Sequence, residues 1–198
     1  MSDTIATVRQ VLVDQLKDLY SAETQITKAL PKLAKAASAP ALRKGFLLHL
    51  EQTKKHVSRI ETICAALDEK PTGKKCAATA GLVEEGQDAI DEEATPEAKD
   101  LLLIAAAQRV EHYEIAAYTS AIALAQALGL KTAAATLSAT LKEEAATDKK
   151  LAAANKPALA LAVKSAKEDA ALGKSPTKKT FVRTARRLAK KVSFKAPV

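Results

Sequence analysis

Apolar residues recur at alternating intervals of four and three residues along several long stretches of this sequence. The clearest stripe lies near the N-terminus and consists of Leu12, Leu16, Leu19, Ile26 and Leu30. Such spacing places side chains on one face of an α-helix, because one helical turn takes about 3.6 residues. The sequence lacks the β-branched and aromatic runs that mark strands, and only 3% of its residues are aromatic. The pattern therefore predicts an all-α fold built from long amphipathic helices.

Carboxylates interrupt these apolar stripes, or lie beside them, in each of four predicted helices. Glu23 lies on the first stripe, Glu111 on the third and Glu144 on the fourth, whereas Glu51 lies at the flank of the second. An ionised carboxylate on a core-facing position costs roughly several kcal/mol unless another group compensates its charge. One such residue in each helix indicates a shared cation, as in the carboxylate-bridged metal sites of four-helix bundles.

Proline, glycine and short polar residues set the expected helix boundaries. The predicted helices run from near residue 4 to 37, and then over about 40–68, 95–128, 131–154 and 157–172, with a shorter helix within 74–95. In this interpretation Lys156 and Pro157 end the helix that begins at 131. Two antiparallel hairpins joined by a long crossover that contains a short helix make a ferritin-like four-helix bundle. We therefore expect a bundle domain over 1–155, an additional helix or linker over 156–172 and a C-terminal extension over 173–198.

The positive charge of the chain is concentrated in that extension. The whole sequence has net charge +8, and the nine basic residues after Gly173, with no acidic residue among them, leave the rest at −1. Phe181, Ala185, Leu188 and Val192 keep a four-three-four spacing there. A basic amphipathic helix of this kind binds nucleic acid, an anionic membrane surface or an acidic partner. The alternative is a solvated extension without a partner.

The sequence also bears on the compartment and on the two cysteines. The N-terminal residues lack the basic and apolar segments of a secretory signal, and no uncharged apolar stretch reaches about 18 residues. We therefore expect a cytoplasmic protein. Cys64 and Cys76 form no Cys-x-x-Cys pair, and a reducing compartment disfavours a disulfide between them. Both are interpreted as structural thiols.

Six short motifs follow one another along the predicted helices and the crossover. They are DLYSAE at 18–23, HLEQT at 49–53, GKKC at 73–76, GLVEEG at 81–86, EHYEIAAY at 111–118 and EAATD at 144–148. In this order and spacing they resemble the bacterial ferritin-like stress proteins of the YciE/YciF type (DUF892 family), over about residues 5–155. The resemblance implies a ferritin-like bundle, a di-iron site, a homodimer and a role in bacterial stress responses.

The candidate metal ligands are six carboxylates. They are Glu23, Glu51, Glu111, Glu114, Glu144 and Asp148. Glu111 and Glu114 are three residues apart and Asp148 follows Glu144 by one turn, so each pair can project toward one point; Glu51 depends partly on the resemblance. Hard oxygen ligands suit two iron ions, with manganese or zinc as alternatives. Tyr20 and Tyr118 lie about one turn from proposed ligands and are candidates for orienting them by hydrogen bonds, the alternative being ordinary burial of their rings.

The sequence departs from the usual ferritin-like motif, in which Glu-x-x-His occurs on two helices. Lys54 follows Glu51 by three residues, and Thr147 follows Glu144 by three. His56 lies about 140° around the helix from Glu51, since successive residues are about 100° apart, so we do not expect it to share the site. His49 can face inward, although a lone histidine there is more often a core residue. The predicted site is rich in carboxylate and poor in imidazole.

Two functions of different classes are consistent with these features. In the first, the bundle holds two bridged metal ions and oxidises Fe²⁺ with dioxygen or peroxide, which would make it an iron-dependent oxidoreductase. In the second, the protein is a non-catalytic helical dimer whose basic extension docks to nucleic acid or to a membrane. The sequence leaves open whether the protein is an enzyme. It contains no catalytic triad arrangement, phosphate-binding glycine loop or dinucleotide fingerprint.

Overall fold

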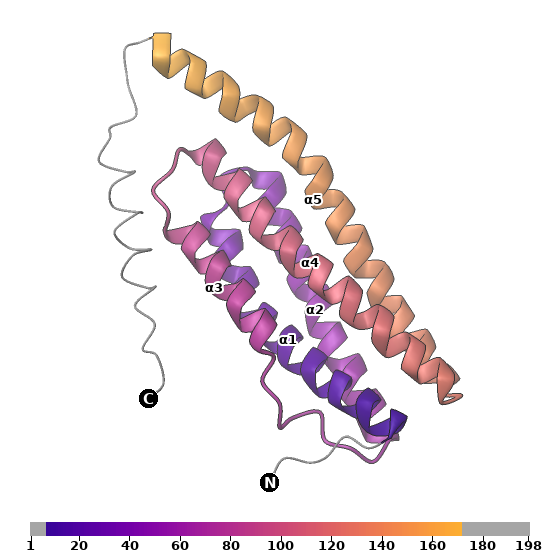
Figure 1. Cartoon of the computed structure of the whole chain (residues 1–198). Coiled ribbons are helices and arrows are strands. Elements are labelled where there is room, and N and C mark those ends of the chain that lie inside the picture. Colours follow the sequence, from indigo (N-terminus) through magenta and orange to yellow (C-terminus); the bar gives the residue numbers. More distant parts are fainter. Residues whose placement is uncertain (1–6, 172–198) are drawn as a thin grey trace, which may run out of the picture.

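The computed structural model describes residues 7–171, and within that range it consists of five helices and no strand (Figure 1). The helices are α1 (Val8–Ala36), α2 (Pro40–Ala66), α3 (Ala77–Asp91), α4 (Pro96–Ala127) and α5 (Lys131–Ala171). α1 packs mainly on α2, and α4 mainly on α5, so the bundle consists of two hairpins. α3 lies in the crossover and packs on α1 and α4. The predicted ferritin-like architecture is confirmed.

The local sequence explains where the helices begin and end. Thr7 and Thr95 cap α1 and α4, because each side chain accepts a hydrogen bond from a backbone N–H three residues later. Pro96 occupies the first position of α4, where a missing N–H is harmless. Gly129 adopts a φ of +70° between α4 and α5, a conformation that favours glycine. The buried Asp100 of α4 accepts hydrogen bonds from two backbone N–H groups in the turn between α1 and α2, at 38–39. These hydrogen bonds connect the two hairpins.

The predicted helix break at Lys156 and Pro157 is wrong. α5 continues through Pro157 to Ala171, and its last turns extend past the rest of the bundle (Figure 1). A proline removes one backbone hydrogen bond, but here the freed carbonyl belongs to the exposed Ala153 and can bind water instead. The alanine-rich sequence on both sides has a high helix propensity and favours a single helix.

The apolar core forms two clusters separated along the bundle axis. The first cluster includes Leu12, Leu16, Leu19, Ile60, Tyr118 and Leu137. The second cluster includes Ile26, Leu30, Phe46, Leu103, Ile104 and Leu151. Each buried leucine or isoleucine contributes roughly 1.5–3 kcal/mol. On each of α1, α2, α4 and α5, a segment of the helix lies between the residues of the first cluster and those of the second. These four segments carry the polar residues described below.

None of the helices in residues 7–171 is long and apolar enough to cross a membrane. The basic segment 173–198 lies outside the described residues. Cys64 and Cys76 are buried and are not joined by a disulfide.

Candidate metal centre

Six ionisable side chains meet in the layer between the two apolar clusters. They are Glu23 from α1, His49 and His56 from α2, Glu111 and Glu114 from α4, and Glu144 from α5. Each is 3% exposed or less. The set combines four carboxylates with two imidazoles, and every bundle helix contributes at least one of them.

Helical spacing explains how these side chains come together. His49 and His56 are seven residues apart, which is about two turns, so both project from the inner face of α2. Glu111 and Glu114 are three apart and share the inner face of α4. Glu23 lies between Leu19 and Ile26 on α1, so the helix face that fills the core also carries this carboxylate inward.

The ligand atoms form two groups that share Glu144. One group comprises His49, Glu111, Glu114 and Glu144, and the other comprises Glu23, His56 and Glu144. Within each group the potential ligand atoms lie within 4.8 Å of one another. Because Glu144 belongs to both groups, its carboxylate has the position of a bridging ligand in the two-metal carboxylate sites of ferritin-like bundles.

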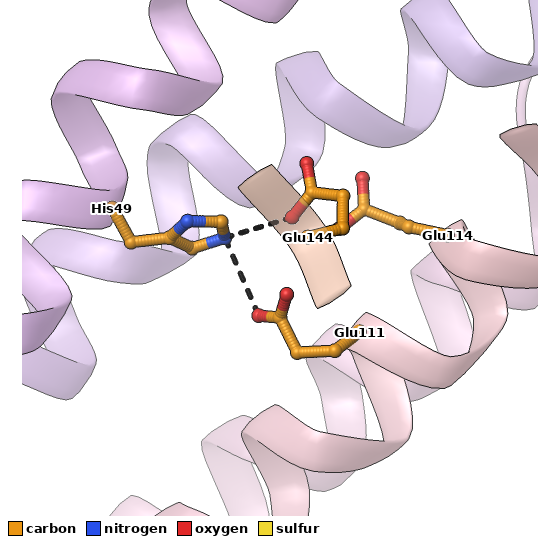
Figure 2. Close-up of side chains that lie close together, drawn as sticks. All are labelled: His49, Glu111, Glu114 and Glu144. Atoms are coloured by element: carbon orange, nitrogen blue, oxygen red, sulfur yellow. Dashed lines mark ion pairs between the residues drawn. The ribbon is translucent and has the colours of Figure 1, made fainter. Parts of the chain in front are cut away.

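Glu144 directs one oxygen to each histidine. Its Oε2 atom lies 3.5 Å from Nε2 of His49, which is also 3.3 Å from Oε1 of Glu111 (Figure 2). Its Oε1 atom lies 2.8 Å from Nδ1 of His56, which is 3.4 Å from Oε1 of Glu23. In Figure 2 the carboxyl group of Glu114 lies beside that of Glu144. The four helices therefore aim their donor atoms at a common space.

Most of these donor atoms lack a hydrogen-bond partner. Both oxygens of Glu114 and of Glu144 are buried without one, as are Oε2 of Glu23 and of Glu111, Nε2 of His49 and Nδ1 of His56. The close contacts between His56 and Glu144 thus do not have hydrogen-bond geometry. Buried polar atoms in folded proteins nearly always have a partner, and an unpaired buried charge is costly. His49 and His56 form ion pairs with Glu111, Glu144 and Glu23, but no hydrogen bond satisfies the atoms named above. The donor set therefore fits a cation, which would bind these oxygens and nitrogens together.

Burial and mutual charge perturb the acidities in the cluster. Burial raises the pKa of Glu111 to about 7, despite the opposing effect of His49. Burial and the charges of neighbouring glutamates raise the pKa of Glu114 well above its usual value. Burial alone would lower the pKa of His49 and of His56, but their contacts with glutamates raise these pKa values to about 9 and about 10. Without a cation, the layer therefore retains protons on groups that a metal needs in deprotonated form.

Further residues hold the side chains of the cluster in place. Nε2 of His56 lies 2.7 Å from Oε2 of Glu143, a carboxylate that also accepts hydrogen bonds from Arg59. In the neutral form that a metal requires, a hydrogen bond donated by Nε2 leaves the lone pair of His56 on Nδ1, which faces the cluster. Tyr118 donates a hydrogen bond to Oε1 of Glu23.

The structure brings together four of the six predicted ligands, namely Glu23, Glu111, Glu114 and Glu144. The prediction of Glu51 is wrong, because its side chain is 62% exposed and forms an ion pair with Lys54 at 2.6 Å. Asp148 is also outside the cluster. It accepts a hydrogen bond from Gln108 at 3.0 Å and lies 3.3 Å from Nε2 of His112, with 21% of its side chain exposed.

Two members of the cluster and one hydrogen bond differ from what we expected from the sequence. His56, which we did not expect in the site, and His49 are both members of the cluster, so the site is not poor in imidazole. The interval of seven residues between them was the signal in the sequence. Tyr20 does not orient a ligand: its hydroxyl donates to Glu61 at the surface, at 3.2 Å.

Comparisons with known proteins place the chain in a family. Residues 7–164 match the family described as Domain of unknown function (DUF892). Protein YciF of Escherichia coli is 45% identical over 146 residues, which span 73% of this chain and 88% of that protein.

Solved structures agree with this assignment. The crystal structure of the E. coli stress protein YciF matches with a TM-score of 0.76 and 42% identity, over 78% of this chain and 98% of that one. YcfI from Rhodopseudomonas palustris matches with a TM-score of 0.73 and 40% identity, over 76% and 96% of the two chains. The chain therefore belongs to the DUF892 family, of which its relative YciF is a structurally characterised example.

Proposed function

We propose that this protein binds two iron ions between its bundle helices and oxidises Fe²⁺ with dioxygen or peroxide in the bacterial stress response. The observation that carries the proposal is the convergence of unpartnered, buried donor atoms on the two sides of Glu144. A mixture of carboxylate oxygens and imidazole nitrogens suits iron, with manganese or zinc as alternatives. The similarity to a stress protein supports the physiological setting.

The two groups of ligands define the residues that would hold each ion. His49, Glu111 and Glu114 would hold one ion, Glu23 and His56 would hold the other, and Glu144 would bridge them. When bound, two Fe²⁺ ions supply two electrons, which with two protons reduce dioxygen to hydrogen peroxide, or hydrogen peroxide to two waters. The apolar clusters above and below the layer exclude water from it.

An anaerobic titration with Fe²⁺, followed by exposure to air and monitored by absorbance, tests this proposal. We expect saturation at two equivalents per chain and then an absorbance change on oxidation. Protein that shows no saturable uptake of Fe²⁺, Mn²⁺ or Zn²⁺ would contradict it.

Replacing Tyr118 with phenylalanine is expected to weaken metal binding without preventing folding. The exchange removes only the hydroxyl that orients Glu23, and loss of such a partner typically reduces metal affinity about 10–100-fold. Tyr20→Phe is the matched control, because that hydroxyl binds the surface residue Glu61 instead. Competition titrations with a chromophoric chelator measure both affinities. Equal affinities for the two variants would show that Tyr118 has no orienting role.

One surface feature favours a second candidate function, a structural homodimer. Leu159 and Val163 lie one turn apart on the projecting end of α5 and are 53% and 46% exposed. Exposed apolar patches often mark association sites. In this alternative the projecting helices pair, and the basic segment 173–198 docks the dimer to nucleic acid or to an anionic membrane.

Substituting both Leu159 and Val163 with serine is expected to shift the dimer to monomer in sedimentation velocity, because burial of each side chain contributes roughly 1.5–3 kcal/mol. Leu161→Ser is the control, since this exposed side chain lies about 200° around the helix from Leu159. An unchanged sedimentation coefficient in the double variant would contradict pairing through this surface.

A further inference from the structure

An apolar cavity of about 80 Å³ lies between α1, α3 and α4. Its wall is formed mainly by aliphatic side chains, including Ile26, Leu82, Val83, Ile90 and Val110. The exposed Lys28 and Lys32 also line it, and so does the buried Glu111, which belongs to the metal cluster. The cavity therefore reaches from the surface beneath α3 to a ligand of the proposed metal pair.

Gly86 keeps this cavity open. It lies in the middle of α3, is buried and lines the cavity. A Cβ atom added at this position would meet no atom within 4 Å. Gly86 also does not have the positive φ that requires glycine, since in the described part of the chain only Gly73 and Gly129 are glycines of that kind. Glycine within a helix costs roughly 0.5–1 kcal/mol relative to alanine, so neither backbone geometry nor helix stability accounts for it.

We propose that this cavity is the route by which dioxygen reaches the metal pair, from the side of Glu111. Small apolar cavities take up apolar molecules such as xenon. Dioxygen is small and apolar, whereas Fe²⁺ and hydrogen peroxide would have to give up their hydration to enter a cavity lined by aliphatic groups. The inference rests on the proposed function, and it selects dioxygen over peroxide as the oxidant served by this path.

Gly86→Leu tests the route, because Gly86 lines the cavity and a Cβ atom there would meet no atom within 4 Å, so a larger side chain at this position takes up cavity volume. Gly86→Ala fills it in part. Gly81→Leu is the matched control: Gly81 is an exposed residue of the same helix, its Cβ would also meet nothing, and it does not line the cavity. Two measurements are compared in full-length protein, namely ¹²⁹Xe chemical shifts of the metal-free form and stopped-flow rates of Fe²⁺ oxidation.

We expect wild-type protein and Gly81→Leu to bind xenon, and Gly86→Leu not to bind it. Anaerobic Fe²⁺ binding should be equal in all variants. Oxidation by dioxygen should slow about tenfold or more in Gly86→Leu, with a smaller effect in Gly86→Ala, while oxidation by peroxide stays within about twofold. The proposed route would be overturned if Gly86→Leu oxidised Fe²⁺ with dioxygen at the wild-type rate. It would also be overturned if the substitution slowed oxidation by dioxygen and by peroxide equally.

The xenon measurement separates this inference from the proposed function. Absence of xenon binding in wild-type protein that takes up and oxidises iron would overturn the route alone. Xenon binding in protein that takes up no metal would contradict the proposed function, and with it the role of the cavity in supplying an oxidant.

Discussion

Glu144→Ala is expected to abolish the binding of both metal ions. Glu144 is the carboxylate that the two groups share, with one oxygen directed to His49 and the other to His56. In the proposed site, loss of this carboxylate would remove a ligand from each ion and also the bridge between them. We expect fewer than about 0.2 equivalents of iron per chain after anaerobic loading and desalting, which corresponds to an affinity reduced at least about 100-fold.

Glu51→Ala is the control for this substitution. Glu51 flanks the apolar stripe in the sequence, but its side chain is 62% exposed and pairs with Lys54. Iron content should remain at the wild-type value in Glu51→Ala. Full iron loading of Glu144→Ala, or equal losses in the two variants, would contradict the assignment of Glu144 as the bridge.

Glu114→Met is expected to stabilise the metal-free protein and to reduce its stabilisation by metal. Neither oxygen of Glu114 has a hydrogen-bond partner, and the neighbouring charges that act on it come from other acidic groups. A buried carboxyl group without a hydrogen-bond partner costs about 1–3 kcal/mol, a cost that an apolar side chain of similar size does not carry. For a chain of this length each kcal/mol raises Tm by roughly 2–4 °C. Calorimetry of the metal-free proteins measures the difference.

The stabilisation by Glu114→Met should depend on pH. The pKa of Glu114 is raised in the folded protein, so the folded state prefers its protonated form, and wild-type stability falls as the pH rises above the unfolded pKa. The advantage of the variant is therefore smaller at pH 5 than at pH 7. Glu51→Met, the same exchange at an exposed site, should change stability by no more than about 0.5 kcal/mol. A metal-free Glu114→Met protein less stable than wild type at pH 7 would contradict the inference that the buried carboxyl group of Glu114 is uncompensated.

Much of the fold can be predicted because the features that specify it are local. The apolar stripe from Leu12 to Leu30 determines the buried face of α1, and the threonine and proline at 95–96 determine the start of α4. Pro157 illustrates where such rules fail. Its effect depends on whether the freed carbonyl can reach water, which is decided by the position of Ala153 on the exposed face of α5.

The candidate site was predictable on three helices and not on the fourth. Glu23, Glu111 and Glu144 interrupt apolar stripes, so their burial follows from the helix period. On α2, however, the buried face contains His49, Thr53, His56 and Ile60, whereas Leu50 and Val57 are only partly buried. The buried face of α2 is therefore rotated away from its most apolar stripe, and it includes both histidines. Angles measured from Glu51 therefore gave the wrong position for His56.

The structure also explains how the cluster departs from the usual pair of Glu-x-x-His motifs. Thr53 precedes His56 by three residues, so the motif on α2 keeps only its histidine. Thr147 follows Glu144 by three, so the motif on α5 keeps only its glutamate. His49 approaches Thr147, with Nδ1 at 3.2 Å from its hydroxyl oxygen, and thus brings an imidazole from α2 to the place of the missing histidine. Glu114 adds a further carboxylate from α4.

Anomalous diffraction at the iron edge, from crystals loaded anaerobically with Fe²⁺, would locate the metal ions within the protein. We expect two peaks in the bundle interior, one beside His49 and Glu111 and one beside His56 and Glu23, with the carboxylate of Glu144 between them. Iron found only at the protein surface, or a bundle interior without any anomalous peak at saturating Fe²⁺, would contradict the proposed metal pair.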